Sequence, residues 1–382
     1  MAEQRRFSAG KTPYIRKANT STYGTEVIMR DFVISLLPLI IFAWVKNGLL
    51  PFIDGNVGVF QMLYPLIFVF VGGFSSILIE RIFYFIVSKE NEEAEKKLRY
   101  SYGLIPGLLL AMVLPINTPI WILILGVVFG VVVGKLLFGG FGYNIFNPAL
   151  VGYVFIVIAF YGVITSSGGV LNANEIGEIT SGVTPLAGFK GSSLNSEGLT
   201  STISAYGGLG NFFLGFIPGS IAETSSLLCI VSFAYLVVRK AINWRIPVVY
   251  VGTVFILSYI IGAINGYATD LTFALFSVLS GGLFFGAVFM ATEPVTSPRT
   301  PNGKIIYALF LGVLTVMLRN ISDMPEGVAT SILFMNLFTP TLDNVFAKVR
   351  VADKPSRMIV NYAVAGLLAV AIFGFTLLQL GA

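Results

Sequence analysis

The segment 179–188, ITSGVTPLAG, carries two hydroxyl side chains, Ser181 and Thr184, around Gly182 and directly before Pro185. Glycine and proline at these positions are typical of a turn, and a turn of this kind is common in loops. The sequence contains no histidine that could activate the threonine hydroxyl as a nucleophile. Any chemistry at Thr184 would therefore come from a group attached to it.

A second candidate is the glycine-dense segment 135–153, KLLFGGFGYNIFNPALVGY. Glycines let another backbone or a planar ligand approach closely, and an Asn-Pro pair interrupts a helix and leaves backbone groups unpaired. Tight helix packing is the alternative, and composition alone favours it. The residues that could line a second ligand site or a pore are Gly139, Gly140, Gly142, Asn144, Asn147 and Pro148.

A third candidate is Glu293, in the polar segment 290–304, MATEPVTSPRTPNGK. An ionisable group next to apolar sequence is a functional hypothesis by default. A solvated helix end near the membrane interface fits this residue equally well. Glu80 and Arg81, late in the apolar run 58–87, are expected to form a pair on the surface of a projecting helix.

The composition indicates which class of protein positions these groups. The chain is 55% hydrophobic and only 11% charged, whereas soluble domains carry about 25% charged residues. It is therefore expected to be an all-α, polytopic membrane protein. The chain has one cysteine, Cys229, and no histidine. This composition excludes internal disulfides, iron–sulfur clusters held by cysteines of this chain and the usual zinc sites. We expect no metal site and no catalytic residues, and a net charge of +5 is no signal for nucleic acid.

The distribution of positive charge predicts the topology. Eleven apolar segments and a cytoplasmic N-terminus place all but three of the 24 lysine and arginine residues on the inner side of the cell membrane, as the positive-inside rule requires. The three exceptions are Lys46, Lys190 and Arg319. This topology places the long polar loop 166–209, which carries Thr184, on the outer face of the membrane.

A weak internal repeat is visible in the apolar segments. The segment 103–115 is too short to span a bilayer and ends at PINTP (115–119), which resembles PVTSP (294–298). Two copies of five segments would be inverted, and such repeats place sites where Gly or Pro breaks a helix; prolines that merely cap helices are the alternative. The resulting division is a cytoplasmic segment 1–29, a first repeat 30–165, the external loop 166–209, a second repeat 210–345 and an additional C-terminal helix in 346–382.

Four motifs occur in order along the chain: GGFGYNIFNPALVGY, SGVTPL, MATEPVTSPRTPNGK and MPEGVATSILFMNLFTPTLD. Together they resemble the RnfD/NqrB family over roughly residues 12–345. These proteins are membrane flavoprotein subunits of the Rnf complex and of the Na⁺-translocating NADH:quinone reductase, and the N-terminal region here looks more like Rnf. The resemblance implies two inverted five-helix repeats with broken helices, similar to urea channels.

The resemblance also implies cofactors. It implies an FMN joined through its phosphate to Thr184 by a dedicated flavin transferase, with Ser181, Gly182 and Pro185 in the matching motif. Val183 stands where the family usually has alanine. In some members a non-covalent riboflavin is implied as well, and we place it near Gly139–Pro148 and Glu293.

The expected function is that of one subunit of an ion-translocating oxidoreductase. Electrons passing between ferredoxin and NAD⁺ would be coupled to movement of Na⁺ or H⁺, and they would enter and leave through partners, the Rnf subunits of the C, G, A, E and B types. Two alternatives remain: an NqrB-type quinone reductase subunit, or a channel or transporter without a redox role. A flavin that stays with the denatured chain on a gel would separate a redox subunit of either type from a channel or transporter.

Overall fold

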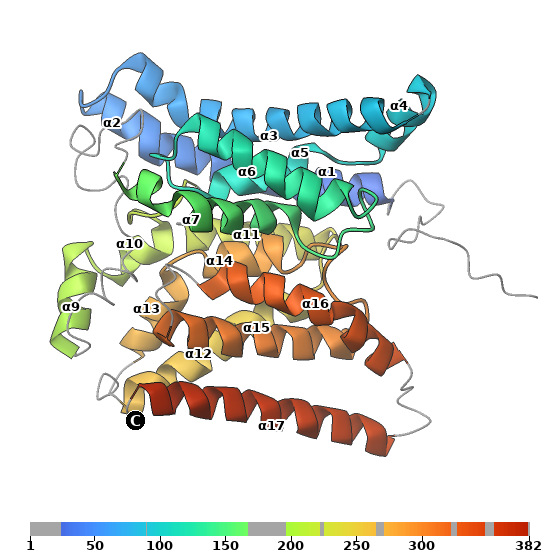
Figure 1. Ribbon diagram of the computed structural model, residues 1–382. Coiled ribbons are helices and arrows are strands. Elements are labelled where there is room, and N and C mark those ends of the chain that lie inside the picture. The colour runs from blue at the N-terminus through green and yellow to red at the C-terminus, as the bar shows by residue number, and fades with distance from the viewer. Residues whose placement is uncertain are drawn as a thin grey trace, which may run out of the picture.

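The computed structural model describes residues 24–88, 90–166, 196–221, 225–264, 271–321, 327–347 and 355–380. Within these ranges the regular secondary structure is helical throughout (Figure 1). Five of these helices are long and apolar enough to cross a membrane, and a bent pair, Thr272–Leu279 with Leu283–Met290, makes a sixth. The expectation of an all-α, multi-pass membrane protein is confirmed.

The first half of the molecule begins with an apolar span of 29 residues, Thr25–Ile53. Shorter apolar helices follow the long helix α3, because glycine and proline end them early. The elements are α1 (Thr25–Trp44), η1 (Val45–Leu49), α2 (Leu50–Ile53), α3 (Val59–Val87), α4 (Asn91–Arg99), α5 (Leu104–Val113), α6 (Ile120–Val131), η2 (Val132–Leu136) and α7 (Pro148–Ser166).

The second half starts after two short helices, α9 (Ser196–Ala205) and α10 (Leu209–Leu214). Helix α9 lies inside the segment that was expected to be a loop, so that expectation is wrong for residues 196–205. The remaining elements are α11 (Ser226–Val238), α12 (Arg245–Ile264), α13 (Thr272–Leu279), α14 (Leu283–Phe285), η3 (Gly286–Met290), α15 (Pro301–Ile321), α16 (Gly327–Ala347) and α17 (Pro355–Gln379).

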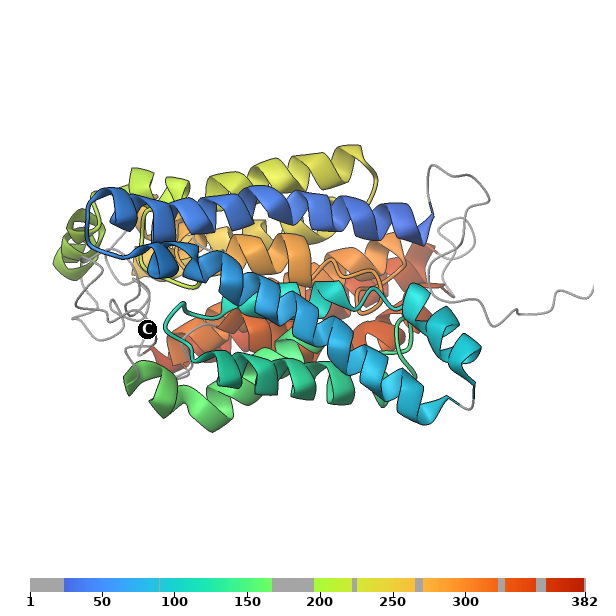
Figure 2. The same ribbon diagram turned by 90° about the horizontal axis from the view of Figure 1, so that it is seen from above.

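The pairing of helices repeats between the halves. Helix α3 packs on α5 and α6, and α6 packs on α7; likewise α12 packs on α13 and α15, and α15 packs on α16. The first helices of the halves, α1 and α11, lie side by side (Figure 2). They are antiparallel: Ser232 Oγ donates to Ser35 O at 2.7 Å, while Arg239, further along α11, pairs with Asp31, earlier in α1. The antiparallel contact joins the first helix of each half, and the inverted repeat itself stays a prediction.

Two apolar segments are interrupted in the structure. In 210–238, α10 ends at Gly215, whose φ is +103°, and α11 begins only at Ser226. In 271–290, α13 stops before Gly281, whose φ is +71°, and the chain bends by 61°. A side chain is strained at positive φ, so glycine permits both breaks.

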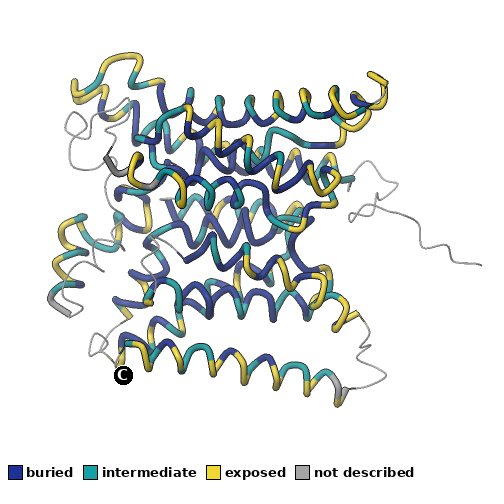
Figure 3. The backbone as a smooth tube through the Cα atoms, in the orientation of Figure 1, coloured by how far each residue is buried: buried dark blue, intermediate teal, exposed yellow. Residues whose placement is uncertain are grey.

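The two ends of the helix bundle differ, and we name them by the short helix at each: the α4 face and the α9 face (Figure 1). The buried residues lie in the middle of the bundle, where the two halves meet (Figure 3). Helix α17 packs beside α15, and only 11% of its most apolar 18-residue stretch is buried. Its outward apolar side suits contact with lipid.

Candidate functional site

The glycine-dense segment forms the loop between η2 and α7. Gly139, Gly140 and Gly142 have φ values of +112°, +93° and +92°. A Cβ atom on Gly140 would strike the Tyr84 hydroxyl. The loop path therefore requires glycine for backbone reasons, beyond the close helix packing that composition favoured.

The loop ends at the Asn-Pro pair that starts α7. Asn147 Oδ1 accepts from the backbone N–H groups of Ala149, at 3.0 Å, and Leu150, at 3.4 Å, so Asn147 is the N-cap of this helix. Pro148 occupies the first helical position, where its missing N–H costs nothing. The cap fixes the Asn147 side chain at the helix entrance.

Both asparagines reach across to the second half of the molecule. Asn144 Nδ2 donates to Glu293 Oε1 at 3.4 Å, and Asn147 Nδ2 donates to Met290 O at 3.4 Å. Thr296 Oγ1 donates to the other carboxylate oxygen of Glu293 at 2.8 Å. Two polar motifs that lie far apart in the sequence therefore meet, and Glu293 is a half-buried, hydrogen-bonded group rather than a solvated helix end.

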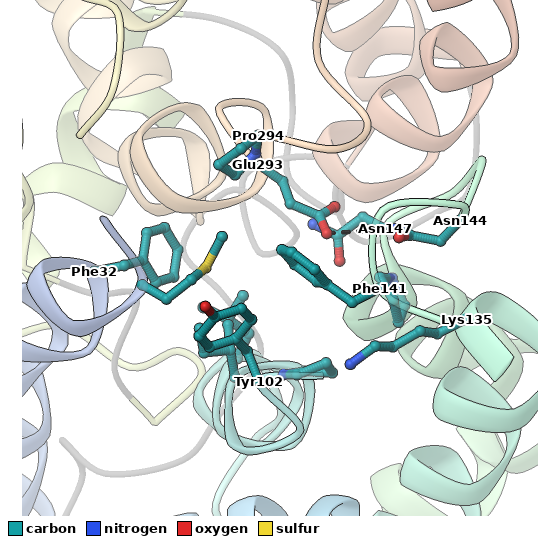
Figure 4. Close-up of a pocket in the computed structure, with 13 residues that line it drawn as sticks. Phe32, Tyr102, Lys135, Phe141, Asn144, Asn147, Glu293 and Pro294 are labelled. Carbon is teal, nitrogen blue, oxygen red and sulfur yellow. Dashed lines mark hydrogen bonds between the residues drawn. The ribbon is translucent and has the colours of Figure 1, made fainter. Parts of the chain in front are cut away.

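A small cavity of about 30 Å³ lies where they meet, on the side of the α4 face; we call it the aromatic pocket (Figure 4). Rings from three separate elements line it, and Tyr102 and Phe141 pack edge to face with centroids 5.0 Å apart. The lining residues are Met29, Phe32, Tyr102, Ile105, Pro106, Leu109, Lys135, Phe141, Asn144, Asn147, Pro148, Glu293 and Pro294.

Two polar atoms of the pocket residues lack partners within the described part of the chain. The Tyr102 hydroxyl and Asn144 Oδ1 are buried and make no hydrogen bond there. Buried polar atoms are usually satisfied, so such groups in a cavity need an explanation. One donor and one acceptor beside aromatic rings suit a flat molecule with polar atoms on its edge.

A buried ion pair stands behind the pocket. Lys135 Nζ lies 2.5 Å from Glu80 Oε1 and 2.6 Å from Ser101 O, and the side chains of Lys135 and Glu80 are 2% and 1% exposed. Ser101 Oγ donates to the other oxygen of Glu80. The expectation that Glu80 lies on the surface is wrong, because the chain folds the α4–α5 connection and η2 over this part of α3.

A larger cleft adjoins the aromatic pocket and shares Asn144 with it. This polar cleft has a volume of about 520 Å³, and half of its lining residues are hydroxyl, amide or charged residues of the second half. Asp343 orders its wall by accepting from the backbone N–H groups of Arg299, at 2.8 Å, and Thr300, at 3.0 Å. The lining residues are Gly142, Tyr143, Asn144, Ile145, Val295, Thr296, Arg299, Thr300, Asn336, Thr339, Pro340, Asp343, Asn344 and Ala347.

The structure therefore brings together one part of the expected site. Asn144, Asn147, Pro148 and Glu293 line the aromatic pocket, and Gly142 lines the polar cleft, whereas Gly139 and Gly140 shape the loop. Sequence reasoning missed Phe32, Tyr102, Lys135 and Phe141; the one available signal was an ionisable Lys135 at the end of an apolar run.

The other part of the expected site cannot be placed. Ser181, Gly182, Thr184 and Pro185 lie outside the described residues. Cys229 is fully buried, as expected for an inert thiol. Over the described ranges, no group of three or more His, Cys, Asp or Glu residues has the arrangement of a metal site.

Comparison with known proteins decides the family. Residues 9–352 match the model of the NQR2, RnfD, RnfE family. The chain belongs to this family. The matched region covers the resemblance seen in the sequence and stops before α17, so the additional C-terminal helix is not part of the shared region.

Individual relatives come from both branches of the family. The chain is 39% identical over 248 residues to the D-type subunit of the proton-translocating ferredoxin:NAD(+) oxidoreductase complex of Clostridium ljungdahlii, covering 64% of this chain and 72% of that protein. It is 31% identical over 345 residues to the D-type subunit of the Na(+)-translocating complex of Acetobacterium woodii, covering 90% and 95%. Identity to the B-type subunit of the Na(+)-translocating NADH-quinone reductase of Chromohalobacter salexigens is 35% over 258 residues, covering 66% of this chain and 60% of that protein.

Proposed function

We propose that this chain is the D-type membrane subunit of an ion-translocating ferredoxin:NAD⁺ oxidoreductase complex. The observation that carries the proposal is the match to the D-type protein of Acetobacterium woodii over nearly the whole length of both chains. The chain passes electrons between other subunits of the complex and is not catalytic alone. In the NqrB-type alternative the complex reduces a quinone, so the acceptor used by membranes that contain this subunit separates the two branches.

We infer that Thr184 carries a covalent FMN. The support is the SGVTPL motif, in which Ser181 and Gly182 precede the threonine and Pro185 follows it. The flavin supplies one-electron chemistry that a threonine hydroxyl lacks. The attachment would be made by a flavin transferase, and in the proposed orientation this loop faces the outside of the cell membrane, whereas the α4 face is cytoplasmic.

The test is flavin fluorescence that migrates with the denatured chain on a gel, after expression with a flavin transferase. Thr184→Val should abolish this fluorescence, whereas Ser181→Ala, at a position that forms no phosphoester, should retain it. Fluorescence that persists in Thr184→Val would overturn the site, and its absence from the unmodified chain would overturn covalent flavin altogether.

We propose further that the aromatic pocket and the polar cleft together hold a non-covalent flavin. The aromatic pocket offers rings, and the Tyr102 hydroxyl and Asn144 Oδ1, which have no hydrogen-bond partner among the described residues. The adjoining cleft offers hydroxyl and amide side chains that suit a polyol chain. When bound, the flavin would supply a second redox centre; Asn144 and Asn147 would hold its ring edge and Tyr102 would donate to it.

Acid precipitation of the purified complex tests the second site, because it releases non-covalent flavin and leaves covalent flavin in the pellet. Asn144→Ala should lower the released flavin with the covalent signal unchanged. Asn344→Ala, in the same cleft but distant from the ring, should have the smaller effect. Equal release from Asn144→Ala and the parent complex would place the flavin elsewhere.

A further inference from the structure

The Lys135 ammonium is the one positively charged group among the residues that line the aromatic pocket. Its side chain is only 2% exposed, and its nitrogen lies 5.8 Å from the centroid of the Phe141 ring, which stands in the middle of the pocket (Figure 4). An ammonium has three N–H donors. Glu80 and Ser101 take two of them, and within the described residues the third has no carboxylate or carbonyl acceptor.

The surroundings hold this ammonium in one place. Lys135 lies in the π-helix η2, an irregularity that is frequent at functional sites. Gly103 leaves room for its partner, since a Cβ atom there would come within 2.7 Å of Glu80 Oε2. Ser101 contributes twice, by accepting from Lys135 through its carbonyl and by donating to Glu80 through its hydroxyl. The charge is therefore fixed and removed from water.

From this geometry we infer that Lys135 sets the reduction potential of a conjugated ring compound in the aromatic pocket, and that Glu80 positions Lys135 and limits its effect. The inference rests on the proposed second redox site. A ring that accepts an electron from a one-electron donor of the complex gains negative charge unless a proton follows. A nearby buried ammonium stabilises that charge far more than it would in water. Flavins and quinones share this chemistry.

The ion pair predicts shifts of opposite sign for its two members. Lys135→Met removes the positive charge and leaves the carboxylate. The one-electron equilibrium should therefore favour the oxidised ring about tenfold more, which lowers the reduction potential by about 59 mV. Glu80→Gln leaves the ammonium uncompensated and should move the equilibrium by a similar factor toward the reduced ring. A role confined to folding would not give opposite signs.

The experiment is a spectroelectrochemical titration of the purified complex, with the released ring compound measured separately. Flavin is recognised by its fluorescence in the acid supernatant, and quinone by its absorbance in a hexane extract. The double variant Lys135→Met, Glu80→Gln avoids a stranded charge and should restore a potential closer to the parent than either single variant gives. Lys135→Arg should keep the one-electron reduction equilibrium of the ring within a few-fold of that in the parent complex.

The control is Arg319→Met, which removes a buried cation at the α9 face and should leave this potential unchanged. Lys135→Met and Glu80→Gln could both retain the ring compound and yet shift its reduction potential in the same direction, or leave it unchanged. Either result would overturn the role of Lys135 and leave the pocket assignment intact. A parent complex that releases neither flavin nor quinone would overturn the proposed second site, and the inference with it.

Discussion

The two faces of the molecule bury positive charge in different ways. At the α4 face, Lys135 is paired with a carboxylate, that of Glu80. At the α9 face, Lys46 donates to Ile217 O at 2.5 Å and Arg319 donates to Ser277 O at 2.6 Å, which are backbone carbonyls.

The difference separates two uses of a buried cation. Carbonyls at the end of a broken helix lack intrahelical donors, so a cation there satisfies the backbone and stabilises the break. Arg319 does this for α13, whose carbonyls at Ser277 and Ser280 it contacts. An ion pair of side chains satisfies no helix end. The Lys135–Glu80 pair instead places an ammonium, neutralised by a carboxylate, beside the aromatic pocket, where no helix end needs a cation.

The largest effect on stability is expected from breaking the pair at the α4 face. Glu80→Gln strands a buried ammonium, and loss of one partner of a buried ion pair costs about 3–5 kcal/mol. Adding Lys135→Met to this variant should recover a large part of that loss. The free energy of unfolding, measured by SDS titration in mixed micelles, checks both values; a single variant as stable as the parent would show that the pair is not desolvated.

A smaller loss is expected at the α9 face. Arg319→Met leaves the carbonyls of Ser277 and Ser280 without this donor, and a buried polar group that loses its partner costs about 1–3 kcal/mol. Both carbonyls are neutral groups, so the loss of this donor should cost less than the uncompensated charge in Glu80→Gln. The same titration measures it, with Lys97→Met as a control at a half-exposed cation whose surface ion pair with Glu93 is worth less.

A loss of about 1–2 kcal/mol is expected for Gly140→Ala, because a side chain at φ +93° is strained. The added Cβ would also strike the Tyr84 hydroxyl, and the ring compound in the aromatic pocket should bind more weakly. Gly252→Ala is the matched control, since nothing lies within 4 Å of a Cβ there and alanine favours a helix. Equal effects of the two substitutions would contradict the role given to the loop.

Much of the fold follows from local patterns in the sequence. Apolar runs in the sequence predict the helices. Glycines at 139–142 and the Asn147–Pro148 pair predict a break in the helical pattern, and the structure confirms it as a loop that leads into a capped helix.

The chemistry of the aromatic pocket could not be predicted in the same way. Lys135 and Glu80 each end or interrupt an apolar run and lie 55 positions apart in the sequence. No residue near either of them indicates that Lys135 Nζ and Glu80 Oε1 lie 2.5 Å apart in the structure. Tyr102 and Phe141 look like ordinary interfacial aromatics until α5 and the glycine loop bring their rings together. Long-range packing, which one sequence does not display, decides these contacts.

The π-helix η2 also constrains how this protein can change in length. A π turn accommodates one residue more than an α turn as a local bulge, so losing one residue from Val132–Leu136 would restore regular winding and leave the flanking residues in place. Lys135, which lies within the bulge, would then be displaced from Glu80. A one-residue gap at this position in a homologue would therefore mark a protein in which the ion pair has been lost, even where lysine and glutamate are both still encoded.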